Sequence, residues 1–140
     1  FQVSQTPIVL SESTERHLAI TFNDHLFVLC LDNKDLKLKK KTDHTIKSLK
    51  FSPDGNFIFI IEEGGHVEVI HIASGTLLMK KSFTLESESI IGCCFASTFS
   101  SSVDLLLLSN VGNVIRLSNL DFEDLNDAVT CKNSARIKEL

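Results

Sequence analysis

Residues 46–83 alternate short apolar runs with turn residues, reading "IKSLKFSPDGNFIFIIEEGGHVEVIHIASGTLLMKKSF". The turn at residues 52–56 is strongly specified, because Pro53 presets φ and Gly55 supplies a left-handed position. The apolar runs around it predict strands at residues 46–51, 57–61, 66–72 and 76–83. Consecutive strands joined by short turns form an antiparallel meander, and about 40 residues is the size of one propeller blade.

Two looser copies of this pattern flank the central one. The preceding copy predicts strands at residues 8–10, 17–22, 26–31 and 35–41, and the following copy at residues 90–95, 103–109 and 113–117. The predicted fold class is therefore all-β, a partial WD-repeat-like β-propeller of about three four-stranded blades within residues 1–118. The blades are expected at residues 8–41, 46–83 and 90–118.

The residue pair that gives WD repeats their name is absent from all three copies. Aligning the third strands places Leu29-Cys30, Ile70-His71 and Leu117-Ser118 at that position, 41 and 47 residues apart. The chain has no Trp. We expect the aliphatic residue to fill the space between blades by burial, without the polar network of the full signature.

The pattern changes after residue 118. Asn119 or Asp121 can cap a helix, and four apolar residues then fall on one helical face: Phe122, Leu125, Ala128 and Val129. Residues 119–140 are predicted to hold a helical connector or insertion.

Three blades are too few to close a ring, since propellers use about 4–8. An open arc would leave apolar blade faces uncovered. The chain also begins at Phe1 rather than Met. We expect it to be part of a larger propeller.

The composition excludes several classes of function. The 140 residues are 43% hydrophobic and 23% charged, with a net charge of −4, which suits a soluble domain. Nucleic-acid binding usually needs a clearly basic domain, so no nucleic-acid partner is expected. The longest apolar runs, residues 57–61 and 105–108, are too short to cross a membrane.

No residues with catalytic, cofactor-binding or metal-binding spacing stand out. The cysteines, Cys30, Cys93, Cys94 and Cys131, form no C-x-x-C pair, and we expect buried, reduced thiols in a cytoplasmic or nuclear protein. His66 and His71 should point to opposite faces of one strand, and the other histidines, His17, His25 and His44, share no ligand spacing. Glu62-Glu63 is expected on a turn.

Two polar segments allow alternative interpretations. Lys37, Lys39 and Lys41 should alternate outward on an edge strand, where lysine discourages pairing with other chains, although a patch for an acidic partner is the alternative. The segment "STFSSSV" (residues 97–103) is interpreted as a solvated loop, with a phosphorylation cluster as the alternative.

The segments "FSPDGNFIFIIEEGGHVEVIHIASGTLLMKKSF" and "VDLLLLSNVGNVIRLSNLDFEDLNDAV" resemble the N-terminal propeller of the Rough deal (Rod) or kinetochore-associated protein family. The resemblance covers about residues 40–130 and includes the Ile70-His71 pair. It implies a non-catalytic scaffold in which a propeller precedes a helical solenoid. The implied partners are Zwilch, Zeste-white-ten, Spindly and dynein, and the implied location is cytoplasmic, on kinetochores and spindle in mitosis, in checkpoint signalling.

Two alternatives stay open at this point. One is the propeller of another propeller-plus-solenoid scaffold, in a vesicle coat, ciliary transport or the nuclear pore. The other is a propeller enzyme or ligand binder with its site at the central channel. Such a site would need ionisable residues converging from the first strands, and those strands offer Lys47, Ser48, Lys50 and two cysteines without an acid–base pair.

Overall fold

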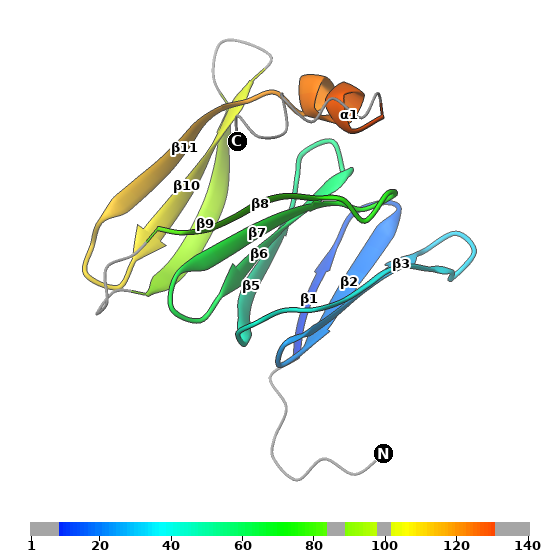
Figure 1. Cartoon of the computed structure of the whole chain (residues 1–140), viewed down its shortest axis with the longest axis horizontal. Helices are drawn as coiled ribbons and strands as arrows, with labels where there is room; N and C mark the ends of the chain where they lie inside the picture. Colours follow the sequence, from blue (N-terminus) through cyan, green and yellow to red (C-terminus); the bar gives the residue numbers. More distant parts are fainter. Residues whose placement is uncertain (1–8, 84–88, 98–101, 131–140) are drawn as a thin grey trace, which may run out of the picture.

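A computed structural model describes residues 9–83, 89–97 and 102–130 of the chain (Figure 1). They form three antiparallel sheets and one helix. The first sheet contains β1 (Val9–Ser13), β2 (His17–Phe22), β3 (His25–Cys30) and β4 (Leu36–Lys41). The second contains β5 (Ile46–Phe51), β6 (Phe57–Glu62), β7 (His66–His71) and β8 (Leu77–Ser82). The third contains β9 (Ile90–Ser97), β10 (Val103–Ser109) and β11 (Val114–Leu120), followed by helix α1 (Phe122–Thr130).

Within each sheet, consecutive strands pair with one another, as the meander pattern predicts. The turn between β5 and β6 shows how the sequence brings two consecutive strands together. Gly55 has a φ of 77°, which an L side chain rarely adopts, and its N–H donates to the Ser52 carbonyl oxygen at 2.9 Å. The Ser52 hydroxyl accepts the Phe57 N–H at 3.0 Å, so the turn holds the end of β5 against the start of β6.

The sheets stand side by side in chain order, with the first strands β1, β5 and β9 next to one another (Figure 1). One buried apolar cluster lies between the first and second sheets and includes Leu26, Val28, Ile58 and Ile70. A second joins the second sheet, the third sheet and α1. The strand β6 is buried along its whole length because it contributes to both clusters.

Helix α1 confirms the predicted C-terminal element. Asp121 caps it, since its carboxylate accepts the Asp124 N–H at 3.1 Å. The four residues expected on one face are the buried ones: Phe122, Leu125, Ala128 and Val129. The Phe122 ring packs against Phe57, Phe59 and Phe95, which fixes the helix over the end of the second and third sheets.

Several expectations need correction. The third sheet has three strands rather than four among the described residues, and α1 follows its last strand. Glu62 ends strand β6 and is 1% exposed, so it does not lie on the turn. Cys94 is exposed rather than buried, because adjacent residues of a strand face opposite sides, and Cys30 and Cys93 are half-buried. Most of the Ser-rich loop (residues 98–101) and the tail from Cys131 onward lie outside the described residues.

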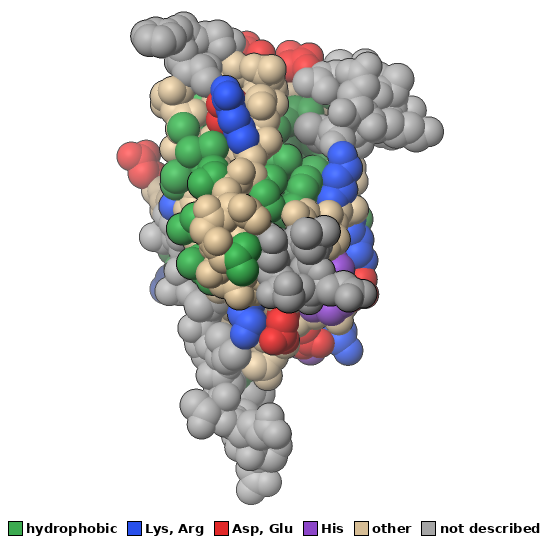
Figure 2. Space-filling model, turned by 90° about the vertical axis from the view of Figure 1, so that its left-hand side faces the viewer, with side chains coloured by type: hydrophobic (Ala, Val, Ile, Leu, Met, Phe, Trp, Pro, Cys, Tyr) green, Lys and Arg blue, Asp and Glu red, His purple; other side chains and the backbone are tan. Residues whose placement is uncertain are grey.

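The outer face of the third sheet exposes apolar side chains. Figure 2 views the molecule from this side and shows hydrophobic side chains gathered across the sheet. A shallow apolar hollow there is lined by Gly92, Cys93, Cys94, Leu106, Leu107, Leu108 and Val114. Val114 is 64% exposed, and Ile91 at the start of the sheet is 65% exposed. A face of this kind marks a contact surface.

Candidate functional site: a polar pocket between neighbouring turns

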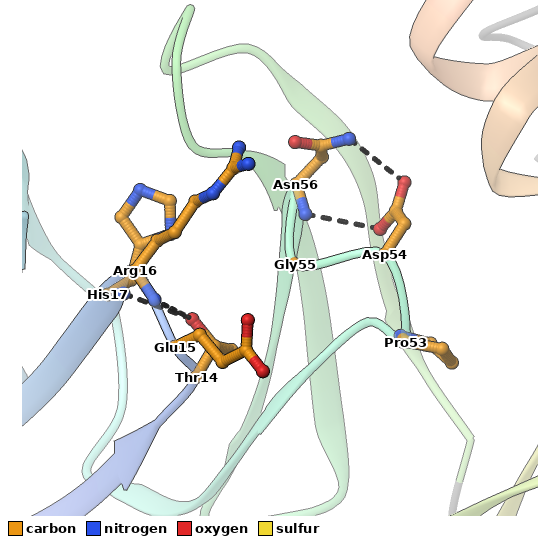
Figure 3. Close-up of a pocket in the computed structure, with 8 residues that line it drawn as sticks. All are labelled: Thr14, Glu15, Arg16, His17, Pro53, Asp54, Gly55 and Asn56. Atoms are coloured by element: carbon orange, nitrogen blue, oxygen red, sulfur yellow. Dashed lines mark hydrogen bonds between the residues drawn. The ribbon is translucent and has the colours of Figure 1, made fainter.

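A polar pocket lies between two equivalent turns of neighbouring sheets (Figure 3). The turn from β1 to β2 supplies one wall and the turn from β5 to β6 the other. Its volume is about 490 Å³, and its lining residues are Thr14, Glu15, Arg16, His17, Pro53, Asp54, Gly55 and Asn56. The position follows from the repeat itself, since each sheet places the same turn at the same edge.

Hydrogen bonds within each turn hold the two walls. The Thr14 hydroxyl accepts the backbone N–H groups of Arg16 at 3.2 Å and His17 at 3.0 Å. The Asp54 carboxylate accepts the Asn56 N–H and side-chain amide, each at 3.1 Å, and also a hydrogen bond from Ser52. Asp54 is therefore occupied by its own loop.

The cationic side chain of the pocket, Arg16, has no such partner among the described residues. Arg16 is exposed, and its guanidinium makes no ion pair or hydrogen bond to any residue that the structure describes. In Figure 3 this guanidinium extends toward the level of Asn56, whereas the Glu15 carboxylate lies on the lower side of the pocket. The pocket is thus lined by one guanidinium and by two carboxylates, those of Glu15 and Asp54.

His17 lies at the back of this pocket, half-buried and stacked against Phe51 with ring centroids 6.3 Å apart. Burial lowers the pKa of His17 below its ordinary value of 6.5, and the charges of Arg16 and Lys37 lower it further. Its Nδ1 atom is buried and has no hydrogen-bond partner among the described residues. A buried ring nitrogen without a partner costs stability.

A smaller pocket of about 170 Å³ adjoins the first at His17 and Asn56. Lys37, Ile72 and Ala73 complete its lining. Lys37 is exposed and has no ion-pair partner in residues 9–83, 89–97 or 102–130. The two pockets together form a groove with Arg16, His17 and Lys37 along one side.

A cluster of buried charge lies between the first and second sheets, and sequence reasoning missed it. The side chains of Glu62 and Glu68 are 0% and 1% exposed. Lys40 of the first sheet lies 3.8 Å from the Glu68 carboxylate, and Lys80 of the second lies 3.7 Å from it. Lys80 also pairs with Asp43.

Glu68 carries the electrostatic cost of this cluster. Burial raises the pKa of Glu68 above its ordinary value of 4.5, and the neighbouring Glu62 carboxyl raises it further, against the opposing charges of Lys40 and Lys80. Oε1 of Glu62 and Oε2 of Glu68 have no hydrogen-bond partner among the described residues.

Two of the histidines lie together, which their positions in the sequence did not indicate. The rings of His44 and His66 stack with centroids 4.1 Å apart, and His44 Nδ1 donates to Glu62 Oε2 at 3.1 Å. His71 lies at the other end of β7. Within the described ranges, no three His, Cys, Asp or Glu side chains gather closely enough to hold a metal ion. Separately, no helix among the described residues is long and apolar enough to cross a membrane.

The Ile70-His71 pair does more than the sequence suggested. Ile70 is 1% exposed and belongs to the cluster between the first two sheets, which confirms its predicted packing role. The expected loss of a polar network is wrong at this position. His71 Nδ1 lies 2.8 Å from the Ser74 hydroxyl, and Nε2 donates to Asn126 Oδ1 of α1 at 3.0 Å.

The lysine-rich strand β4 lies at the edge of the first sheet. Lys37, Lys39 and Lys41 are exposed, as the alternation predicts. Lys39 Nζ lies 6.0 Å from the centroid of the Phe27 ring, and Lys41 lies 4.0 Å from the Asp24 carboxylate. Only Lys37 of the three lines the groove.

Comparison with solved structures identifies the fold. The computationally designed Ika4 protein superimposes with a TM-score of 0.64 at 15% identity, covering 80% of this chain and 66% of Ika4. The WD40 domain of SCAP from fission yeast gives a TM-score of 0.58 at 13% identity, covering 80% of this chain and 33% of that domain. The complex of the fission yeast SREBP and SCAP binding domains gives a TM-score of 0.59 at 17% identity, covering 84% of this chain and 36% of that chain.

These identities are low, so the similarity concerns the fold alone, which is WD40-like. The chain spans about two thirds of the Ika4 chain and about one third of the two fission yeast chains. Among curated protein sequences, none matches this chain.

A comparison with protein families gives a match over the whole sequence. The matching family is described as "KNTC1, N-terminal", and the match covers residues 1–140. A family of kinetochore proteins combined with a WD40-like fold points to a scaffold rather than an enzyme. The chain belongs to the KNTC1 N-terminal family, the amino-terminal region of the Rod kinetochore-associated proteins.

Proposed function

We propose that this chain forms three blades of a β-propeller that serves as a docking platform in a Rod-like kinetochore scaffold. The single observation that carries the proposal is the family match across residues 1–140. The platform would hold Zwilch within an assembly that also contains Zeste-white-ten and recruits Spindly and dynein. The protein would act in the cytoplasm and, during mitosis, at kinetochores and spindle, in checkpoint signalling.

The architecture supports a propeller. The three sheets repeat one meander at regular intervals, and their first strands adjoin, as inner strands do around a propeller axis. The exposed apolar side chains of the third sheet would pack against a further blade of the parent protein. The blades would span residues 8–41, 46–83 and 90–118, with residues 119–140 as a connector that begins with α1.

The test is a pull-down from mitotic cell extract with the intact parent protein as bait. A second bait lacks residues 1–140, and a third carries Ile70→Asp, which places a charge between the first two sheets. Lys39→Glu is the matched control, because Lys39 is exposed on β4 and outside both clusters. Retained proteins are identified by mass spectrometry.

We expect the intact protein and the Lys39→Glu variant to retain Zwilch and Zeste-white-ten. The deletion and Ile70→Asp should lose Zwilch. Retention of vesicle-coat, ciliary or nuclear-pore components in place of the kinetochore proteins would leave the fold standing and reject the kinetochore function. Undiminished retention of Zwilch by the deletion would reject these residues as the platform.

A further inference from the structure

We propose that the groove formed by the two adjoining pockets binds an extended segment of a protein partner through an acidic side chain, with Arg16 as the principal recognition residue and Lys37 and His17 beside it. This inference rests on the proposed docking function, and it names the chemistry of the partner and the place where it binds. The groove is the juxtaposition of the turn after β1, the turn after β5 and the turn after β7.

The shape of the groove suits a peptide. A pocket of about 490 Å³ continuing into one of about 170 Å³ can accept more than one side chain. Gly55 forms part of its floor, and a Cβ atom there would meet nothing within 4 Å, so the space above its backbone is open. Both walls are held by hydrogen bonds within their own turns, so the site is formed before a partner arrives.

The charges favour an acidic side chain at one end. Arg16 and Lys37 are both exposed and without ion-pair partners among the described residues. The Asp54 carboxylate is also negative, but it already accepts hydrogen bonds from Ser52 and Asn56. A guanidinium binds a carboxylate through two parallel hydrogen bonds, which gives direction as well as strength.

A carboxylate fits this groove better than a phosphate. Glu15 lies in the same pocket as Arg16, and its carboxylate repels a dianion more strongly than a single negative charge. Burial keeps His17 neutral near pH 7, so the groove gains no third full positive charge to compensate. The Glu15 carboxylate suits a neighbouring basic or amide group of the same segment.

The experiment measures fluorescence anisotropy with the full-length protein and three labelled peptides of equal length. The probe is a repeat of Glu-Gly-Ser, the uncharged control is a repeat of Gln-Gly-Ser, and the third peptide replaces each Glu by phosphoserine. The protein variants are Arg16→Gln, Arg16→Lys and Lys37→Gln. Lys39→Gln is the charge-matched control, since it removes the same charge from the same strand as Lys37, outside the groove.

We expect the Glu peptide to bind and the Gln peptide to show no binding. Arg16→Gln should weaken binding of the Glu peptide about tenfold, as loss of a charge-assisted bidentate contact does. Arg16→Lys should weaken binding less than Arg16→Gln, because the positive charge remains although the paired guanidinium hydrogen bonds are lost. Lys37→Gln should weaken it severalfold, and Lys39→Gln should change it by less than about twofold.

Equal affinity of the Arg16→Gln and unaltered proteins would overturn the inference, as would binding of the phosphoserine peptide alone. The same protein preparations are also tested for retention of Zwilch and Zeste-white-ten. Retention of both without binding of the Glu peptide rejects the groove and keeps the docking function. Loss of both from the unaltered protein rejects the docking function itself.

Discussion

At the residue scale, Glu68 is the side chain whose environment conflicts most with its charge. It is 1% exposed, near Glu62, and two lysines lie 3.7 and 3.8 Å from its carboxylate. Since its pKa is raised in the folded protein, its protonated form is favoured there. Its contribution to stability is fully present below pH 4.5 and is lost as the pH rises through the folded-state pKa.

Glu68→Gln should therefore stabilise the propeller at neutral and higher pH, because the amide removes the charge and keeps the shape. Below pH 4.5 the variant and the unaltered protein should have similar free energies of unfolding. Urea unfolding of the complete propeller across this pH range measures the difference. Glu63→Gln is the control, since Glu63 is 63% exposed and should show no comparable trend. A gain that shrinks with rising pH would contradict the assignment.

At the scale of elements, helix α1 is joined to the second sheet through His71. The bond from His71 Nε2 to Asn126 spans 55 residues of sequence, and the Phe122 ring packs on Phe57 nearby. Asn126→Ala should cost about 1 kcal/mol, the usual net value of such a hydrogen bond. Hydrogen exchange should rise in α1 and stay unchanged in β6.

Asp127→Ala is the matched control for this prediction, because Asp127 is exposed on the same helix. Equal exchange in the two variants would show that α1 is held by its apolar face alone. That outcome would reduce the His71 network to a local feature of the turn after β7.

A second element-scale prediction concerns strand β11. Asp104 of β10 accepts hydrogen bonds from the Asn119 N–H at 3.0 Å and from Arg116 Nε at 2.6 Å. Asn119 has a φ of 59°, and the register between the strands shifts here. The hydrogen bond from Asn119, followed by those from Arg116, lowers the pKa of Asp104, so its contribution to stability is present above pH 3.8 and is lost on acidification through its lower folded-state pKa.

Asp104→Ala should lower the free energy of unfolding at neutral pH, because the Asn119 N–H and the Arg116 guanidinium lose their shared acceptor. The loss should shrink as the pH falls below 3.8. Thermal unfolding of the complete propeller at neutral pH and below pH 3.8 measures this loss of stability. A cost that is the same at both would indicate that packing, rather than the carboxylate, holds this bend.

At the scale of the whole molecule, stability depends on the two interfaces between sheets. Ile70→Asp should cost about 4 kcal/mol or more, since it buries an unpaired charge between the first two sheets. Lys39→Glu should cost well under about 1 kcal/mol as a surface change. Urea unfolding of the complete propeller compares them. Similar losses would contradict the burial of Ile70 between the first and second sheets.

The sequence predicted the parts of this fold that depend on local chemistry. The turn at Gly55, the strand alternation around Ile70 and the apolar face of α1 are all encoded within a few neighbouring residues. The packing of side chains between sheets was not predictable in this way. Glu62 looked like a turn residue because Glu63, Gly64 and Gly65 follow it, yet it ends strand β6 and is buried.

The candidate groove was missed for the same reason. Arg16 and Asn56 are 40 positions apart, and only the side-by-side placement of equivalent turns brings them together. A polar residue at matching turns of successive repeats is the signal that could have indicated it.

The order of pairing in this chain has a consequence for its synthesis. In the part of the chain that the structure describes, each strand pairs with the strand before or after it in sequence, so these sheets form from neighbouring segments. Proteins rich in such local contacts fold quickly, and domains form in order as the chain leaves the ribosome. The strands of the first sheet can pair before the second sheet has been translated, and each later sheet can then pack against the sheet before it.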